Sequence, residues 1–196
     1  MGKGWLIVSK KEMTKIWVDD KFVPVTLVNV LPQEIVRYKN NEKDWYVAVV
    51  VWTGKKEKWK RMVYKMLTEF KVDDEFVKNN PVWKILDMDL LNWINEVSVS
   101  WYGKWKGFQW AMKKCNVHWW PKTHWSKFHR TVWSMWNRKP RRTLKWHPAA
   151  WRMWNEKVIL KNKKVFDMMK KDWENLLVIW WSAPGWYNSL LKLFIQ

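Results

Sequence analysis

The run FVPVTLVNV at residues 22–30 decides the fold class, together with the run YVAVVVW at residues 46–52. Both runs are rich in β-branched residues and have the length of a β-strand. Shorter candidate strands lie at residues 6–8, 35–38, 94–99, 158–160, 176–179 and 190–195. Many short strands without alternating helices are typical of an antiparallel sheet or barrel. We therefore expect a mainly β protein.

A single helix is expected at residues 57–70, which read EKWKRMVYKMLTEF. Met62, Met66 and Phe70 are spaced at i, i+4 and i+8, so they would share one face of a helix. Ordinary core packing is the interpretation that we favour for that face.

Regular apolar patterning fades between residues 103 and 155, where Pro121, Pro140 and Pro148 interrupt the chain. This stretch is too long for a silent loop in a compact domain, so it should be functional or ordered by a partner. The sequence therefore predicts a β domain formed by residues 1–100 and 156–196, interrupted by a basic extension at residues 101–155. No internal repeat is evident.

Positive charge is concentrated in the same stretch. The 196-residue chain has 37 Lys and Arg against 18 Asp and Glu, a net charge of +19. Residues 97–155 contain no Asp or Glu, yet they hold 13 of the Lys and Arg and all four His. Such an excess needs a polyanionic partner to offset its self-repulsion, and acids are excluded where a surface lies against phosphates. A solvated charged face is the plainer alternative, but it explains the loss of acids less well.

Membrane and secretory classes are disfavoured. The chain has no run of about 18 uncharged apolar residues, which a membrane-spanning helix needs. The apolar run at residues 5–8 is too short for a secretory signal. We therefore expect a cytoplasmic protein without membrane contact. Cys115 is the single cysteine, which excludes an internal disulfide.

Catalytic and metal chemistry have little support. Ser126 lies near His124 and His129, but the stretch has no acid to orient a histidine. The C-x2-H spacing of Cys115 and His118 is a weak signal, because structural zinc normally has four ligands at stricter spacing. The chain also lacks the G-x-x-x-x-G-K phosphate loop. We expect no enzyme activity, no catalytic or metal site, no cofactor and no small-molecule substrate.

Tryptophan is far above normal use, with 22 residues, whereas the 6 glycines fall below the roughly 7% expected. Many tryptophans stand in polar contexts such as residues 104–106 (KWK), 118–121 (HWWP) and 145–148 (KWHP), which resemble turns that need glycine. Three interpretations compete. The tryptophans stack on unpaired RNA bases, they form an unusual aromatic core, or many are glycines, written as Trp because UGA codons that the source reads as glycine were translated with another code.

The acid-free stretch resembles the bacterial L-three family of large-subunit ribosomal proteins, whose members typically read G-x-x-K-G-K-G-F-x-G, then H-G, T-H-G-S, H-R, G-S-I-G and M-G-N. Here residues 101–110 read WYGKWKGFQW, residues 118–130 read HWWPKTHWSKFHR and residues 133–137 read WSMWN. The match becomes close when glycine is read at Trp101, Trp105, Trp110, Trp119, Trp125, Trp133, Trp136, Trp146, Trp151 and Trp154. These coincidences favour the glycine interpretation. Similar motifs at residues 13–26, 44–54 and 176–185 extend the resemblance over nearly the whole chain.

The resemblance implies a β-barrel domain interrupted by a long irregular basic extension. In such a protein the extension penetrates 23S rRNA toward the peptidyl transferase centre, and the protein is a structural constituent that helps to start large-subunit assembly. The implied partners are 23S rRNA and neighbouring large-subunit ribosomal proteins. Two alternatives are another basic RNA-binding module and a Trp/Lys-rich membrane-surface binder. The latter needs a long amphipathic helix, which a proline-broken stretch cannot supply.

The cations of the extension are the candidate RNA contacts. Arg forks clamp phosphate in a bidentate way, so Arg138, Arg141 and Arg142 are the strongest candidates. Lysines act as point charges that neutralise phosphates and release counterions, and histidines donate to phosphates or bases. The full candidate set is Lys104, Lys106, Lys113, Lys114, Lys122, His124, Lys127, His129, Arg130, Arg138, Lys139, Arg141, Arg142, Lys145, His147 and Arg152.

Overall fold

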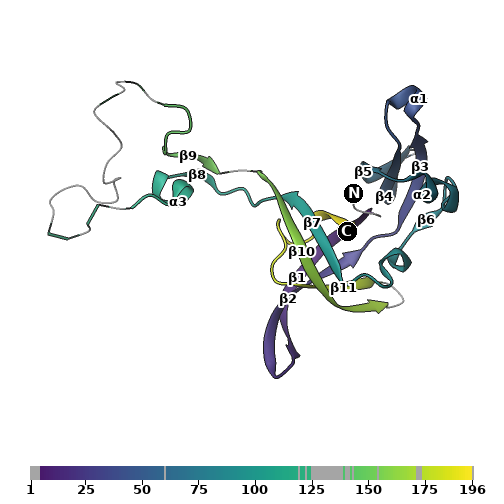
Figure 1. Cartoon of the computed structure of the whole chain (residues 1–196), viewed down its shortest axis with the longest axis horizontal. Helices are drawn as coiled ribbons and strands as arrows, with labels where there is room; N and C mark the ends of the chain where they lie inside the picture. Colours follow the sequence, from purple (N-terminus) through teal and green to yellow (C-terminus); the bar gives the residue numbers. More distant parts are fainter. Residues whose placement is uncertain are drawn as a thin grey trace. The chain divides into compact units, whose positions relative to one another are not determined.

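The chain divides into two compact units in the computed structural model (Figure 1). The first unit comprises Met1–Tyr102 and Lys157–Gln196, and the second comprises Gly103–Glu156. The structure describes residues 5–59, 61–118, 120–121, 123–124, 139, 142, 144–153, 155–170 and 174–195.

The first unit contains a closed antiparallel barrel whose strands follow the order β1-β12-β7-β10-β11-β2. Its strands are β1 (Trp5–Val18), β2 (Lys21–Val30), β7 (Glu96–Tyr102), β10 (Lys157–Lys170), β11 (Asn175–Trp180) and β12 (Leu190–Ile195). The two longest strands are irregular, with register shifts between Lys10 and Met13 in β1 and between Leu160 and Lys163 in β10. Such bulges bend and twist a strand, which helps a small sheet to close on itself. The predicted mainly β fold with a barrel is confirmed.

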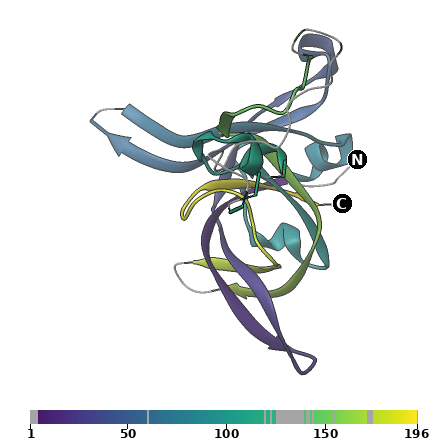
Figure 2. The ribbon, with the colours of Figure 1, turned by 90° about the vertical axis from the view of Figure 1, so that its left-hand side faces the viewer.

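A second sheet of four strands, in the order β5-β4-β3-β6, belongs to the same unit (Figure 2). Its strands and the adjoining short helices are β3 (Gln33–Lys39), α1 (Asn41–Asp44), β4 (Ala48–Lys58), β5 (Arg61–Lys71), α2 (Asp74–Asn79), β6 (Ile85–Leu86) and the 3-10 helix η1 (Met88–Leu91). Every strand pair in both sheets is antiparallel.

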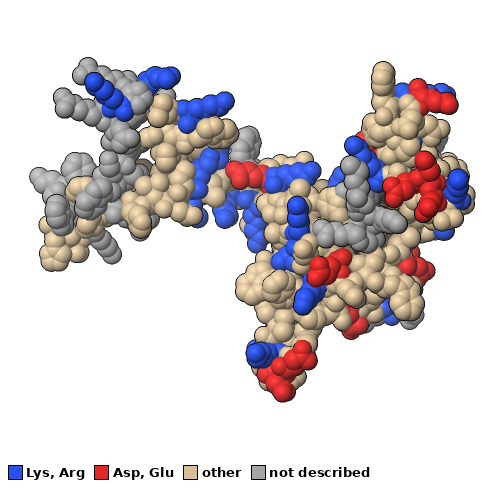
Figure 3. Space-filling model, viewed as in Figure 1, with Lys and Arg blue, Asp and Glu red and all other residues tan. Residues whose placement is uncertain are grey.

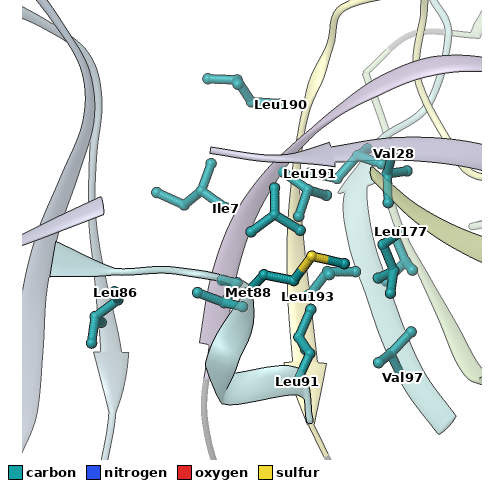
Figure 4. Packing of buried hydrophobic residues seen from close by; sticks show 14 of the residues in the cluster. Ile7, Val28, Leu86, Met88, Leu91, Val97, Leu177, Leu190, Leu191 and Leu193 are labelled. Atoms are coloured by element: carbon teal, nitrogen blue, oxygen red, sulfur yellow. The ribbon is translucent and has the colours of Figure 1, made fainter. Parts of the chain in front are cut away.

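One apolar cluster joins the barrel to the second sheet (Figure 4). Leu177 and Leu193 of the barrel are fully buried, and they belong to the same cluster as Leu86, Met88 and Leu91 from β6 and η1. Burying a side chain of this size contributes roughly 1.5–3 kcal/mol. The segment from β6 to η1 therefore fastens the two sheets together.

A half-buried amine adds a polar link between the sheets. The Lys192 Nζ on β12 donates a hydrogen bond to the Thr68 Oγ1 on β5, and it lies 5.5 Å from the centre of the Phe70 ring. Burial lowers the pKa of Lys192 from its ordinary value, because a charged amine loses hydration there.

The strands expected at residues 22–30, 6–8, 35–38, 158–160, 176–179 and 190–195 are confirmed in β2, β1, β3, β10, β11 and β12. Those expected at 46–52 and 94–99 are confirmed from Ala48 onward in β4 and from Glu96 onward in β7. The helix expected at residues 57–70 is wrong, because these residues form most of the β4–β5 hairpin. Thr68 and Phe70 are buried and alternate with exposed Leu67 and Glu69, a period of two. Residues four apart share one face in a helix and also in a strand, so the spacing of Met62, Met66 and Phe70 fits both structures. Pairing of this segment with β4 decides for the strand.

The second unit has little regular structure among its described residues. Its elements are β8 (Gly107–Gln109), α3 (Ala111–Cys115) and β9 (Trp151–Met153). None of the helices in the described part of the chain is long and apolar enough to span a membrane.

Candidate nucleic-acid interface

A short two-stranded ribbon organises the described part of the second unit. Strands β8 and β9 pair in antiparallel register with Phe108 opposite Arg152. Two further backbone hydrogen bonds continue the ladder, from the Lys106 N–H to the Met153 carbonyl at 2.8 Å and from the Gly103 N–H to the Glu156 carbonyl at 2.8 Å. The ribbon brings together residues that are far apart in sequence, so Lys106, immediately before β8, lies beside Met153, the neighbour of Arg152 on β9.

Helix α3 follows the ribbon and fixes two more lysines. Its apolar residues Ala111 and Met112 are buried, whereas Lys113 is exposed and Lys114 is half-buried. The helix ends at Asn116, which adopts the left-handed conformation common at a helix C-terminus. The Lys114 Nζ lies 5.8 Å from the centre of the Trp151 ring on β9, a cation–π distance that links α3 to the ribbon.

Ten of the predicted RNA-contacting residues fall within the described part of the chain. Eight are exposed, namely Lys104, Lys106, Lys113, His124, Lys139, Arg142, Lys145 and Arg152. Lys114 and His147 are half-buried. The predicted residues that lie outside the described part are Lys122, Lys127, His129, Arg130, Arg138 and Arg141. The role of the whole set in RNA contact stays a prediction.

The electrostatic character of the two units differs. In the first unit, Lys11 pairs with Glu174 at 2.6 Å and Lys39 pairs with Glu69 at 2.6 Å. The hydrogen bond that the Lys11 Nζ donates to the Glu174 carboxylate raises the pKa of Lys11. The second unit offers no such carboxylate before Glu156, and Figure 3 accordingly shows Lys and Arg without Asp or Glu over most of its described surface. An exposed array of unneutralised cations favours binding of a polyanion.

No group of three or more His, Cys, Asp or Glu within the described residues is arranged to hold a metal ion. Cys115 is an exposed free thiol, and His118 and His124 are also exposed. His129 lies outside the described residues.

Indole exposure bears on the identity of the tryptophans. Trp105 is 62% exposed, and Trp146 is 91% exposed with a φ of 68°, as the glycine interpretation predicts for turn positions. Trp101 differs, because it is half-buried and packs against the core cluster. Trp110 and Trp151 are exposed. The remaining tryptophans of the resemblance, Trp119, Trp125, Trp133, Trp136 and Trp154, lie outside the described residues.

A second group of cations lies in the β4–β5 hairpin and was not predicted from the sequence, because a helix was expected there. Residues 55–65 contain six Lys and Arg and a single acid, Glu57. Counting charge in short windows would have found this group, because no other part of the first unit has so large a local excess.

Taken together, these features define a class of protein: a closed β-barrel interrupted by a cation-rich unit suited to a polyanionic partner. The chain is 32% identical to the large ribosomal subunit protein uL3 of Thermotoga petrophila, over 96% of this chain and 95% of that protein. It is 30% identical to uL3 of Persephonella marina, over 98% of this chain and 89% of the relative. It is 29% identical to uL3 of Fervidobacterium nodosum, over 95% of both. No family model matches the chain.

The chain belongs to the uL3 family of large ribosomal subunit proteins. The resemblance noted from its glycine-like tryptophan motifs is thereby confirmed.

Proposed function

We propose that this protein is a structural constituent of the large ribosomal subunit that binds 23S rRNA through residues 101–155. The observation that carries the proposal is the loss of every acid from residues 97–155 while 13 Lys and Arg remain. The names of its uL3 relatives support the ribosomal assignment. The protein is not an enzyme, and it works in the cytoplasm beside neighbouring large-subunit proteins.

The mechanism is electrostatic positioning. Each Lys or Arg that neutralises a phosphate releases condensed counterions, and this release supplies the affinity. Exposed Lys106 immediately before β8, Arg152 on β9 and Lys113 on α3 present charge from one small folded region, so that region meets rRNA with its shape already set. Arginines at positions 138, 141 and 142 clamp phosphates in a bidentate way. Directed toward the peptidyl transferase centre, the extension joins rRNA segments and helps to initiate subunit assembly.

The test compares two variants of the full-length protein that each lose three charges. The extension triple is Lys106→Gln, Lys113→Gln and Arg152→Gln, three exposed residues of the second unit. The control triple is Lys21→Gln, Lys43→Gln and Lys78→Gln, three exposed residues of the first unit near acids. Affinity for 23S rRNA is measured over a range of salt concentrations.

We expect the extension triple to make the slope of log K against log salt shallower by about three, since each lost phosphate contact removes about one. The control triple should change it little. Equal effects of the two triples would overturn the proposal, because binding would then depend on net charge and not on the second unit.

A further inference from the structure

The β4–β5 hairpin extends beyond the other strands of its sheet, and the part that extends is rich in Lys and Arg. We call residues 55–65 the basic hairpin. β3 pairs with β4 only from Ala48 to Thr53. Beyond Gly54, β4 pairs with β5 alone among the described strands (Figure 2). The basic hairpin is therefore a two-stranded ribbon with no third strand beside it.

The basic hairpin accounts for most of the net charge outside the second unit. It carries six Lys and Arg against one acid within eleven residues. The remainder of the first unit has 18 Lys and Arg against 16 Asp and Glu, so it is nearly balanced. The side chains of Lys55, Lys56 and Lys65 are exposed. Charge this local is a property of the hairpin and not of the unit's surface in general.

Such a ribbon is poorly stabilised by itself. An isolated two-stranded hairpin is marginally stable in water. The exposed Lys55 and Lys56 on β4 and Lys65 on β5 give both strands of the ribbon positive charge. A polyanion lying along the ribbon would offset this charge and favour its ordered form.

We propose that the basic hairpin is a second rRNA-binding surface, which contacts the phosphate backbone independently of residues 101–155. The partner is RNA and not an acidic protein, because lysine is depleted from protein–protein interfaces. Phosphate and ribose contacts are also how double-stranded RNA is mostly recognised. The proposal rests on the ribosomal function proposed above, since that function supplies the RNA.

The experiment uses the full-length protein and a hairpin triple, Lys55→Gln, Lys56→Gln and Lys65→Gln, beside the control triple. Affinity for 23S rRNA is measured over a salt series. Amine modification of each lysine, read by mass spectrometry, is compared with and without the RNA. Melting of each variant shows whether the fold is kept.

We expect the hairpin triple to make the salt slope shallower by about two to three, and RNA to protect the three lysines from modification. If wild-type protein binds 23S rRNA but the hairpin and control triples behave alike, the hairpin proposal fails while the proposed function stands. Absence of binding by the wild type would overturn both. Protection of the lysines only after other ribosomal proteins are added would instead identify a protein partner.

A second inference comes from backbone conformation and concerns which residues the protein contains. Thirteen described non-glycine residues have positive φ. Seven are Asp, Asn or His, the side chains that tolerate the left-handed region best. The other six are Trp45, Trp59, Trp83, Trp93, Trp146 and Trp181. A bulky aromatic residue at positive φ is a true outlier, whereas glycine adopts it freely.

Burial of the indole does not account for this conformation at four of the six positions. Trp45, Trp59, Trp93 and Trp146 are each at least 91% exposed. Trp17 contrasts with them. It lies within β1 without positive φ, and its ring packs edge-on against Phe22 at 4.6 Å.

We infer that the six positive-φ positions are glycine in the protein that its source makes. The five positions other than Trp146 are assigned from backbone conformation. They were not among the positions that were matched to family glycines in residues 101–154. The measurement is peptide mass of the protein purified from its own source. Each peptide that contains one of these positions should be lighter by one Trp-to-Gly difference, and the six codons should be UGA. A peptide mass that matches tryptophan, or a UGG codon, would refute the inference at that position.

Discussion

The first unit buries apolar side chains from both of its sheets in one cluster, whereas Ala111 and Met112 are the only buried hydrophobic residues among those described in the second unit. The first unit also pairs cations with acids, and the second has no acid before Glu156. Because burial of apolar area is the main favourable contribution to folding, the first unit contains the source of its own stability. We expect the second unit to depend instead on a partner that supplies opposite charge.

The largest expected effect concerns that partner. If the second unit makes roughly ten phosphate contacts, log K for 23S rRNA should fall with log salt at a slope of about −7 to −9. The affinity would then drop by roughly 10⁴–10⁵ between 50 and 200 mM salt. Filter binding over that range measures the slope. A slope shallower than about −3 would contradict phosphate contact by the second unit.

The next effect tests whether stability resides in the first unit. Leu193→Ala removes a fully buried side chain from β12, so we expect a loss of about 2–5 kcal/mol in the free energy of unfolding. Lys106→Gln, an exposed change in the second unit, should alter it by less than about 0.5 kcal/mol. Urea titration of both variants measures the difference. Comparable losses would mean that the units share their stability.

A smaller effect concerns the positive-φ tryptophans. In protein made with tryptophan at these positions, Trp93→Gly should stabilise the first unit by about 1 kcal/mol, because a left-handed conformation costs an L-residue roughly 1–2 kcal/mol. Glycine's greater entropy when unfolded offsets part of this gain. Trp17→Gly is the control and should destabilise by about 1 kcal/mol, through loss of the Phe22 contact. Losses in both variants would count against strain at Trp93.

Much of the first unit could be predicted from its sequence, because β-branched runs such as residues 22–30 have the length and composition of strands. The helix prediction failed where Met62, Met66 and Phe70 fit both periods, and a non-local partner strand decided the outcome. The barrel order was also beyond local patterns, since β1 closes against β12 from the far end of the chain. The resemblance to the L-three family predicted a barrel, whereas the strand-like runs alone left an antiparallel sheet or a barrel open.

The candidate site was predictable for a different reason. Charge and missing acids are compositional, so Lys104, Lys106 and Arg152 could be proposed without any structure. What composition could not give is which of them lie together, and the β8–β9 pairing brings residues near 107 beside residues near 152. The basic hairpin was not predicted, because residues 57–70 were expected to form a helix.

The smallest expected effect on stability, paired with a clear effect on assembly, comes from replacing Arg138, Arg141 and Arg142 together by Ala. Arg142 is exposed, and the other two lie outside the described residues. Exposed substitutions usually change the free energy of unfolding by less than about 0.5 kcal/mol each, so the melting transition of the first unit should remain. Incorporation into large subunits should fall, since bidentate phosphate clamps are lost.

Replacement of the same three residues by Lys is the matched control, because it keeps the charge and removes the fork of the guanidinium group. Partial recovery of incorporation is expected. Measuring melting and incorporation side by side separates folding from assembly. A triple variant that loses its melting transition yet still enters ribosomes would place these arginines in the stability of the fold and remove them from rRNA contact.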